Sequence, residues 1–334
     1  MNTVQFPGLW GLEFSISRVA FKVFGIEIYW YGVIIAFGFL LAVLLAMKSS
    51  KDFGIEPDSI IDLVLYATPA AIVAARLYYV VFSWDSFKDN LWEVFNTRKG
   101  GLAIYGGVLG AVIVGYVFAR AKKIGVFKLF DFAAPYLVLA QGIGRWGNFV
   151  NQEAFGTNTN LPWGMTSESI REYLRMNVEE LSAIGINVNP DFPVHPTFLY
   201  ESLWDVGLFF FLIWYRRKKK LDGEVFFLYM ILYGVGRFWI EGLRTDSLML
   251  GSFRVSQLLA ALFAVILTAI FFIRRKKVGE DKEMDTGIGT SSYGAVLKEL
   301  QEQEKRQYEH ENNSPMIQKA VEPSDTNKKR EEEL

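Results

Sequence analysis

Ionisable residues inside apolar stretches are the first candidates for chemistry in this chain. Arg76 lies in AARLYYV, Arg145 in GIGRWGNFVNQEAFG and Arg237 in YGVGRFWIEGLR, while His195 and Glu201 open a further apolar stretch at HPTFLYES. A charged side chain in a membrane helix costs about 2.5–3.5 kcal/mol on insertion scales, so it normally faces a partner or a cavity. These positions therefore indicate either a binding site or a set of buried ion pairs.

Their spacing favours a site for an anion. Tyr233, Arg237 and Glu241 are four residues apart, and Arg145 and Asn148 are three apart, so each set shares one helix face. Two guanidinium groups from different helices, beside an amide and a phenol, would bind phosphate, because the planar fork of arginine donates parallel hydrogen bonds.

A competing interpretation is that these charges only neutralise one another. Arg237 could bridge Glu241 one turn away, and Arg145 could reach Glu153. Several arginines on separate helices with polar partners favour the anion site, since unpaired charge is expensive in lipid.

Other residues have structural and functional interpretations side by side. Tyr31, in IYWYG, fits an aromatic belt at a membrane interface. Gly106 and Gly110 form a GxxxG pattern, which predicts close helix packing or room around Tyr105 for a lipid. His195 precedes a proline, which favours a loop or capping role.

The elements that must position these residues are predicted to be helices that cross a membrane. The chain has 334 residues, of which 51% are hydrophobic and 21% charged, and its mean hydropathy is +0.20, which excludes an ordinary soluble enzyme. Apolar stretches of spanning length predict an all-α, polytopic membrane protein. The seven expected helices are Tyr29–Met47, Ile60–Phe82, Gly101–Ala119, Leu129–Val150, Tyr200–Tyr215, Val225–Ile240 and Val255–Ile273.

Basic clusters predict how these helices are oriented. The clusters at 120–128, 216–220 and 274–277 are separated by even numbers of crossings and belong on the cytoplasmic side. The N-terminus and residues 151–199 then face outward, and the C-terminus is cytoplasmic. The segment 84–100, with Lys88, Arg98 and Lys99, fits this arrangement poorly.

Three parts follow from the distribution of charge. Residues 1–28 are expected to form an interfacial segment on the outer surface, and residues 29–273 a seven-helix transmembrane domain that includes the outward segment 151–199. Residues 274–334 are expected to form a charged cytoplasmic tail, disordered or transiently helical around 295–311.

The composition excludes several classes of site. With 35 Lys and Arg against 36 Asp and Glu, the chain has no basic field for nucleic acid. It has no cysteine and only two histidines, so no metal cluster built from these ligands is expected.

The motifs together resemble a known family. GRWGNFVNQEAFG is similar to the signature of the bacterial prolipoprotein diacylglyceryl transferases, and IYWYG, GGLAIYGG, HPTFLYE and YGVGRFWIEGLR resemble its other segments in order, over roughly residues 15–275. The resemblance implies transfer of the diacylglyceryl group of phosphatidylglycerol to the lipobox cysteine of a prolipoprotein, with a thioether formed and glycerol phosphate released. It also implies a place in the bacterial cytoplasmic membrane and no cofactor.

The same resemblance implies roles for individual residues. Arg145 and Arg237 match the family's essential arginines and would hold the lipid phosphate, which makes them catalytic candidates together with Tyr105. The remaining matched positions would bind phosphatidylglycerol, with Gly156 allowing a tight turn or a close backbone approach. They are Tyr31, Asn148, Glu153, Gly156, Tyr233, Glu241 and Arg244, and Arg76 and His195 are further possibilities.

One position departs from the family. Many members have histidine, cast as the base for the thiol, where this chain has Tyr105. A neutral tyrosine is a poor base, since its pKa of about 10 describes loss of its own proton. Tyr105 could ionise beside the arginines or only hydrogen-bond a substrate. Alternatively, His195, Glu153 or the positive field could generate the thiolate.

Two other classes of function fit the buried arginines. A transporter or flippase for an anionic lipid would use them as a binding site, although the sequence shows no inverted repeat. A membrane scaffold would use them only in ion pairs.

Overall fold

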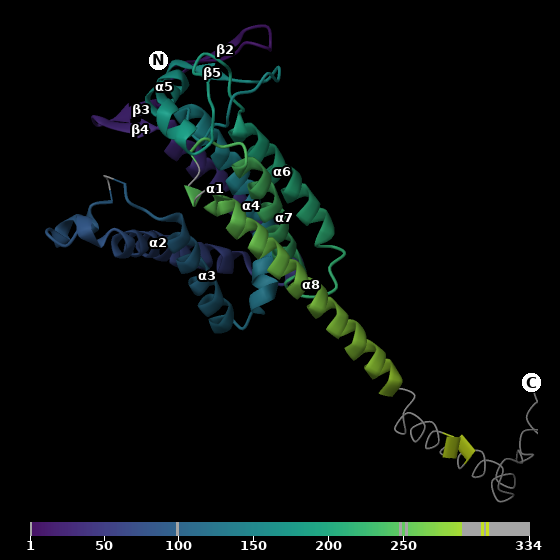
Figure 1. Cartoon of the computed structure of the whole chain (residues 1–334). Helices are drawn as coiled ribbons and strands as arrows, with labels where there is room; N and C mark the ends of the chain where they lie inside the picture. Colours follow the sequence, from purple (N-terminus) through teal and green to yellow (C-terminus); the bar gives the residue numbers. More distant parts are fainter. Residues whose placement is uncertain are drawn as a thin grey trace, which may run out of the picture. The chain divides into compact units, whose positions relative to one another are not determined.

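Within the part of the chain that the structure describes, seven long helices form where the apolar stretches predict them (Figure 1). The computed structural model describes residues 2–97, 100–246, 249–250, 253–288, 302–303 and 305–306. The long helices are α1 (Trp30–Ser50), α2 (Pro57–Phe82), α3 (Ile104–Ala121), α4 (Val126–Asn151), α6 (Thr197–Tyr215), α7 (Glu224–Glu241) and α8 (Val255–Ile288). Short 3-10 turns lie between them at η1 (Lys51–Phe53), η2 (Trp84–Ser86) and η3 (Leu91–Phe95).

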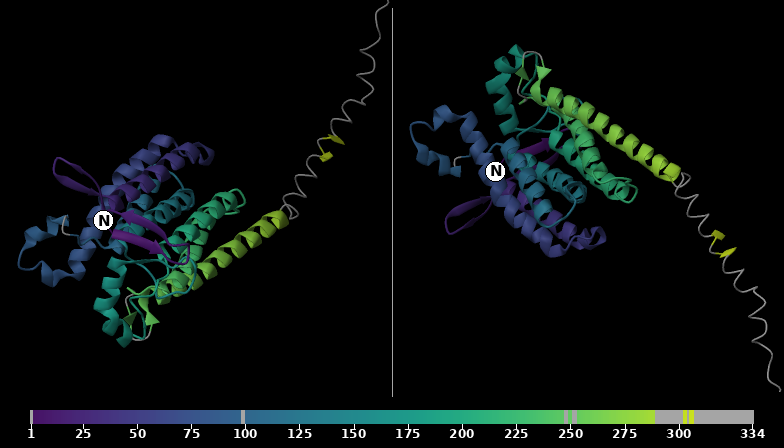
Figure 2. Two further views of the ribbon diagram at one scale, coloured as in Figure 1. Left: turned by 90° about the horizontal axis from the view of Figure 1, so that it is seen from above. Right: turned by 90° about the horizontal axis from the view of Figure 1, so that it is seen from below.

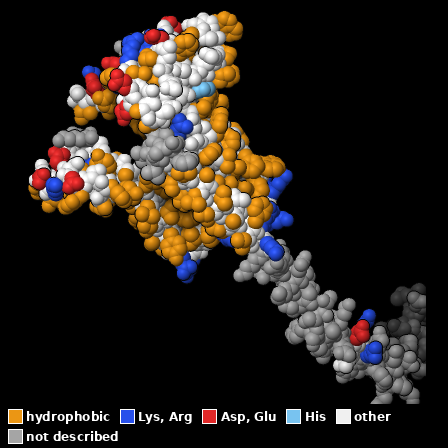
Figure 3. All heavy atoms as spheres, viewed as in Figure 1, with side chains coloured by type: hydrophobic (Ala, Val, Ile, Leu, Met, Phe, Trp, Pro, Cys, Tyr) orange, Lys and Arg blue, Asp and Glu red, His pale blue; other side chains and the backbone are white. Residues whose placement is uncertain are grey.

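Most of these helices are long and apolar enough to cross a membrane. Among the described residues six qualify, and α7 falls short because Glu224, Arg237 and Glu241 lie within its eighteen residues. Hydrophobic side chains cover much of the visible surface of the helices, while acidic side chains gather over the end that carries the strands (Figure 3). The protein is therefore an all-α, multi-pass membrane protein.

The helices pack through small residues and apolar faces. Helix α4 packs against α1, α6 and α7, and α2 pairs with α3. A Cβ added at Gly106 would lie 2.5 Å from the Ala74 carbonyl, and one at Gly110 would lie 2.6 Å from Ala74 Cβ. The predicted packing role of this GxxxG pattern is thus confirmed. Helix α8 runs beside α7, since a Cβ added at Gly234 of α7 would lie 3.4 Å from the carbonyl oxygen of Ala260 in α8.

Strands and one more helix, α5 (Glu168–Ala183), gather at one end of the helices (Figures 1 and 2). The strands β1 (Asn2–Phe6), β2 (Leu12–Ile16) and β5 (Thr166–Ser167) form an antiparallel sheet in the order β2-β1-β5, with Val4 opposite Phe14 and Ser167. The strands β3 (Val19–Val23) and β4 (Ile26–Tyr29) form a hairpin that runs into α1. A third hairpin joins β6 (Met249–Leu250) to β7 (Phe253–Arg254).

The residues of β1, β2, β5 and α5, with the chain between α4 and α6, form what we call the lobe. Its core joins Val4 and Phe6 to Met165, Ile170 and Leu174, which are distant in sequence. Residues 1–28 were expected only as an interfacial segment, whereas residues 2–29 form two hairpins. Residues 151–199 likewise contain an ordered helix on a buried core. This core could not be inferred from the sequence, because both segments are polar in composition and the core forms only when apolar side chains from the two segments meet.

The sheet joins two segments that the basic clusters predict to lie on the same side of the membrane. Strands β1 and β5 are hydrogen-bonded, and the four helices α1–α4 lie between them in sequence. The pairing brings residues of the segments 1–28 and 151–199 together at one end of the helices, and the side of the membrane that this end faces stays a prediction. At the opposite ends of the helices, Lys122 pairs with Asp62 at 2.8 Å and Lys219 with Asp131 at 2.9 Å.

The C-terminal part differs from the expected boundary. Contacts divide the chain into Met1–Phe271 and Phe272–Leu334, and α8 continues past the predicted end at Ile273 to Ile288. The rest of the predicted tail, apart from 302–303 and 305–306, lies outside the described residues, as do Arg98 and Lys99.

Candidate active site

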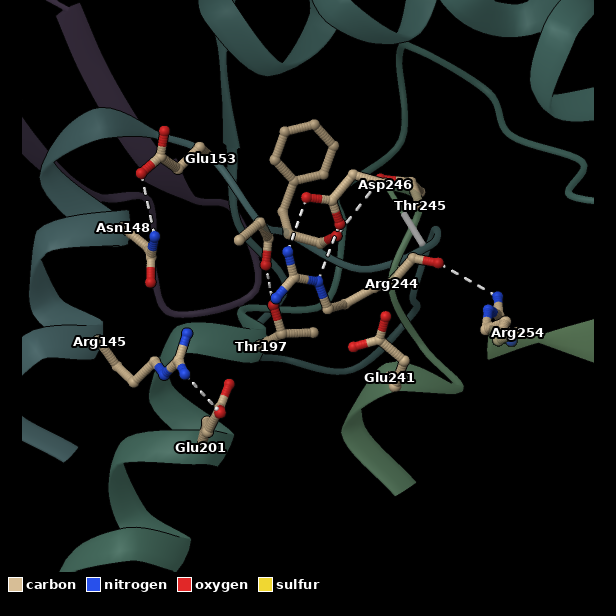
Figure 4. Close-up of polar contacts among 12 residues, drawn as sticks. Arg145, Asn148, Glu153, Thr197, Glu201, Glu241, Arg244, Thr245, Asp246 and Arg254 are labelled. Atoms are coloured by element: carbon tan, nitrogen blue, oxygen red, sulfur yellow. Dashed lines mark hydrogen bonds and ion pairs between the residues drawn. The ribbon is translucent and has the colours of Figure 1, made fainter. Parts of the chain in front are cut away.

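Two arginines from different helices meet at one carboxylate. Arg145, near the end of α4, places Nη2 2.9 Å from Oε1 of Glu201 on α6 (Figure 4). Arg237, on α7, donates from Nη1 to both Glu201 oxygens at 3.2 and 3.1 Å. The Glu201 side chain is 4% exposed, whereas Arg145 and Arg237 are 23% and 21% exposed. The carboxylate is therefore buried, while the side chains of the two arginines that hold it are partly exposed.

The pairing combines both interpretations of the sequence. The predicted bridge between Arg237 and Glu241 is present. Arg145, however, pairs with Glu201, not with Glu153. The arginines thus converge as an anion site requires, and in this structure a carboxylate of the chain occupies the place between them.

Glu153 has a different role, in the turn that follows α4. Its Oε1 accepts hydrogen bonds from Asn148 Nδ2 at 3.0 Å and Asn151 Nδ2 at 3.2 Å. Gln152 caps the helix in the left-handed conformation, with φ of 56°. The carboxylate of Glu153 therefore holds the turn closed and orients the Asn148 amide.

Gly156 fits where no side chain could. A Cβ there would lie 2.7 Å from His195 Cβ and 3.0 Å from the Leu243 carbonyl. Its amide donates to the His195 carbonyl at 2.9 Å, and it bridges to Arg244 as an isolated antiparallel pair. The close backbone approach predicted for Gly156 is confirmed, and it joins the end of the α4 turn to the segment after α7.

Arg244 is fixed by a bidentate ion pair. Its Nε and Nη2 donate to the two oxygens of Asp246 at 2.8 and 2.7 Å. Burial lowers the pKa of Arg244, but the hydrogen bond and charge of Asp246 outweigh burial and raise the pKa overall. Arg254 donates to the Arg244 carbonyl at 3.1 Å, which ties β7 to the same corner.

A cleft of about 570 Å³ opens beside this corner. Tyr31 forms part of its wall and lies against α4, since a Cβ at Gly147 would come within 2.7 Å of the Tyr31 ring. The cleft lies between the lobe, the β3–β4 hairpin and the α4 turn, and polar and aromatic side chains line it. They include Arg18, Tyr29, Tyr31, Asn151, Glu153, Tyr173 and Asp246.

Tyr233 and Asp205 complete the surroundings of the arginines. Tyr233 lies one turn before Arg237 and within electrostatic reach of Arg145 and Glu201. Asp205 lies one turn after Glu201, is 0% exposed, and neither of its oxygens has a hydrogen-bond partner among the described residues. Sequence reasoning noted Glu201 without placing it in the site, and it missed Asp205. The sequence signal that could have found both residues was a pair of acidic side chains four positions apart in an apolar helix.

Like Glu153, three further predicted residues have no hydrogen bond or ion pair with Arg145 or Arg237 within the described part of the chain. Arg76 donates to backbone carbonyls of the segment after α2, including Val94 at 2.7 Å and Gly101 at 2.9 Å, and so organises that segment. Tyr105 is 66% exposed and has no hydrogen bond within the described part of the chain. The Arg76 side chain is thus engaged by the backbone after α2, and Tyr105 has no polar partner among the described residues.

His195 also lies apart, in the segment before α6. Its Nδ1 is 3.1 Å from the Tyr200 hydroxyl, and its backbone bonds to Gly156 and Thr157. Burial lowers its pKa, so the ring is neutral at pH 7. The loop role predicted for His195 agrees with these contacts. Within the described residues no cluster of three or more His, Asp or Glu could hold a metal ion.

Comparison with known proteins identifies related sequences. The profile of the prolipoprotein diacylglyceryl transferase family matches residues 18–274. The phosphatidylglycerol–prolipoprotein diacylglyceryl transferase of Clostridioides difficile (strain 630) is 42% identical over 264 residues, 78% of this chain and 98% of that protein. A protein of the same name from Finegoldia magna is 44% identical, over 78% of this chain and 97% of its own length. Another from Pediococcus pentosaceus is 45% identical, over 80% of this chain and 93% of its own length.

Proposed function

The chain belongs to the prolipoprotein diacylglyceryl transferase family, and we propose that it transfers the diacylglyceryl group of phosphatidylglycerol to the lipobox cysteine of a prolipoprotein. The products are a thioether-linked diacylglyceryl protein and glycerol phosphate, the first step of lipoprotein maturation. Relatives named as transferases cover most of the chain, so the transporter alternative is not favoured.

The convergence of Arg145 and Arg237 on one carboxylate carries this proposal. A phosphodiester offers two oxygens in a similar arrangement, so the N–H groups that hold Glu201 are suited to hold phosphate. When the glyceryl carbon–oxygen bond breaks, the charge on the phosphate rises from one to two negative charges. Guanidinium groups that are already in place stabilise this developing charge without reorganisation.

The neighbouring residues position the lipid. Asn148, held by Glu153, presents a donor near the arginines, and Glu241 holds Arg237 from the opposite side. Tyr31, against Gly147 of α4, and Tyr233, within electrostatic reach of Arg145, contribute phenols. Gly156 joins the α4 turn to the segment that holds Arg244, which Asp246 fixes (Figure 4 shows Arg244 with Asp246).

The prolipoprotein enters from the side that carries the lobe. The cleft beside the α4 turn is polar and lies at the ends of the helices, which suits the residues around a lipobox at a membrane surface. We place the enzyme in the bacterial cytoplasmic membrane with the lobe outward, because the basic clusters that follow α3 and α6 lie at the other ends of the helices.

A product assay tests the proposal. Purified protein in detergent is mixed with phosphatidylglycerol and a lipobox peptide that carries one cysteine, and peptide mass and glycerol phosphate release are followed. The expected result is a diacylglyceryl mass increase with an equal yield of glycerol phosphate. A folded protein that retains phosphatidylglycerol but forms neither product would refute the transferase and support transport.

A further inference from the structure

The resting cluster has no positive charge to spare for a phosphate. Arg145 and Arg237 face Glu201 and Glu241, so two positive charges meet two negative ones. Asp205 adds a third carboxyl group one turn below Glu201. An incoming phosphodiester brings a further negative charge, and the product carries two. A charge must therefore leave the cluster or be neutralised when lipid binds.

Glu201 is the group that a phosphate would displace. Its oxygens accept from Nη2 of Arg145 and Nη1 of Arg237 at 2.9 to 3.2 Å, and both arginine side chains are partly exposed. Glu241, in contrast, contacts only Arg237 of this pair, from one turn away on the same helix. Binding of phosphate by both arginines thus competes with Glu201 in particular.

We propose that Glu201 is the base of the reaction: phosphate binding frees it from the arginines, and the freed carboxylate accepts the proton of the lipobox thiol. The proposal rests on the transferase function above. It assigns a role to a residue beyond the phosphate-binding pair, and it couples the two substrates, because the base becomes available only when the lipid is in place.

The surroundings of Glu201 favour proton uptake by its carboxylate once phosphate is bound to the two arginines. Its side chain is 4% exposed. The charged and titratable groups that face it are Arg145 from α4, Arg237 and Tyr233 from α7, with Glu241 behind Arg237, and Asp205 from its own helix. Asp205 offers no compensating charge, since it is itself a buried carboxyl group that has no hydrogen-bond partner among the described residues. An unpaired buried carboxylate is costly, and accepting a proton removes that cost.

The step balances in atoms and electrons. The S–H bond breaks, and its proton goes to a carboxylate oxygen of Glu201. The sulfur electron pair forms the C–S bond with the glyceryl carbon as the carbon–oxygen bond to phosphate breaks. That electron pair stays on the phosphate oxygen, which leaves glycerol phosphate as a dianion between Arg145 and Arg237. When the product departs, Glu201 returns its proton to solvent and the ion pairs re-form.

The other candidates for the base lie in less suitable places. Tyr105 is exposed and has no hydrogen bond within the described residues. His195 holds Tyr200 in the segment before α6, and Glu153 is engaged by two asparagine amides. Glu201 alone of these four is in direct contact with both arginines.

Two peptides with different nucleophiles test the proposal. One carries the lipobox cysteine, and the other carries selenocysteine, whose selenol is ionised at neutral pH and needs no base. Glu201→Gln should slow transfer to cysteine by at least about 100-fold, within the range of general-base catalysis, while transfer to selenocysteine stays within about tenfold of native. The same variant should retain phosphatidylglycerol at least as tightly as native protein, because the competing carboxylate is gone.

Glu241→Gln is the matched control. It removes an equally buried carboxylate, also 4% exposed, from the same Arg237. Whatever activity it retains should keep the native ratio between the two peptides. A Glu201→Gln variant with the native ratio would overturn the proposal while the transferase function stands. Native protein that modifies neither peptide would instead refute the transferase function itself.

Glu201→Asp covers the case in which the glutamine variant does not fold. It keeps the charge that holds the arginines and withdraws the carboxylate by one methylene. The expected result is a loss of transfer to cysteine several times larger than the loss with selenocysteine. Equal losses with both peptides would overturn the proposal.

Discussion

Helix α4 carries a buried charge cluster at each end, and the two clusters are built differently. At the end near residue 131, the Asp131 carboxylate is 0% exposed and accepts from Lys219 Nζ at 2.9 Å and from the amides of Gly223 and Phe226 at 2.8 and 2.9 Å. At the other end, Asp205 is equally buried, yet neither of its oxygens has a hydrogen-bond partner among the described residues.

The contrast separates stability from function. Asp131 caps the start of α7 and fixes the connection after α6, as expected of a carboxylate that holds structure together. The cluster at Arg145 keeps partly exposed arginine side chains and a carboxyl group that has no hydrogen-bond partner within the described residues, a cost that stability alone does not explain. A buried charge that is fully paired is part of the scaffold, whereas one that is left incomplete points to a ligand.

The largest expected effect is on turnover. Arg145→Ala should lower transfer by at least about 100-fold, the loss seen when one donor to a developing oxyanion is removed. Arg216→Ala is the control at the other end, where Arg216 donates to Tyr136 at 2.9 Å and lies over the Phe53 ring. It should keep near-native turnover. Similar losses of product formation in both variants would erase the distinction between the two ends.

The next effect is on stability and compares the two buried aspartates. Asp131→Asn breaks the ion pair with Lys219, whose carboxylate partner is fully buried. It should destabilise the fold by about 3 kcal/mol. Asp205→Asn replaces an unpartnered carboxyl by a neutral amide and should change stability by less than about 0.5 kcal/mol, or raise it. Thermal unfolding in one detergent measures both. The comparison fails if Asp205→Asn is the more destabilising change.

Two glycines test how tightly the α4 turn is joined to its neighbours. Gly156→Ala places a methyl 2.7 Å from His195 Cβ and should cost about 1–3 kcal/mol, as overpacking does. Gly144→Ala, in α4 with nothing within 4 Å of the added Cβ, should stabilise by about 0.5 kcal/mol. If both variants raised the melting temperature, the backbone contact between Gly156 and His195 would be able to shift and accept a methyl group.

The smallest effect is a pH dependence at the lobe. Burial places the folded-state pKa of His195 below its unfolded value of about 6.5. The unfolded chain therefore binds more protons between the two values, and stability falls as pH drops below about 6.5. The loss should be about 1 kcal/mol or less by pH 5. His195→Gln should flatten this part of the curve of melting temperature against pH, and an unchanged curve would contradict the assignment.

The helices were predictable from sequence because their signal is local. Apolar length alone gave α2 through Phe82 and α6 through Tyr215, with starts within a few residues of those observed. The lobe was not predictable in this way, since Val4 meets Ser167 only in three dimensions. Helical spacing found the pair of Arg237 with Glu241. It could not find the partner of Arg145, because the register between α4 and α6 is set by packing at positions such as Gly142, against Asp205 and Ser202.

The pairing of β1 with β5 also has a consequence for how the protein is made. Residues 2–6 emerge from the ribosome before the four helices α1–α4, yet one edge of this strand is completed only by residues 166–167. The strand must wait, unpaired on that edge, while the intervening helices enter the membrane, since such long-range pairing forms slowly. Cotranslational insertion and closure of the lobe are therefore ordered events, with the lobe sealed only after the fourth helix is in place.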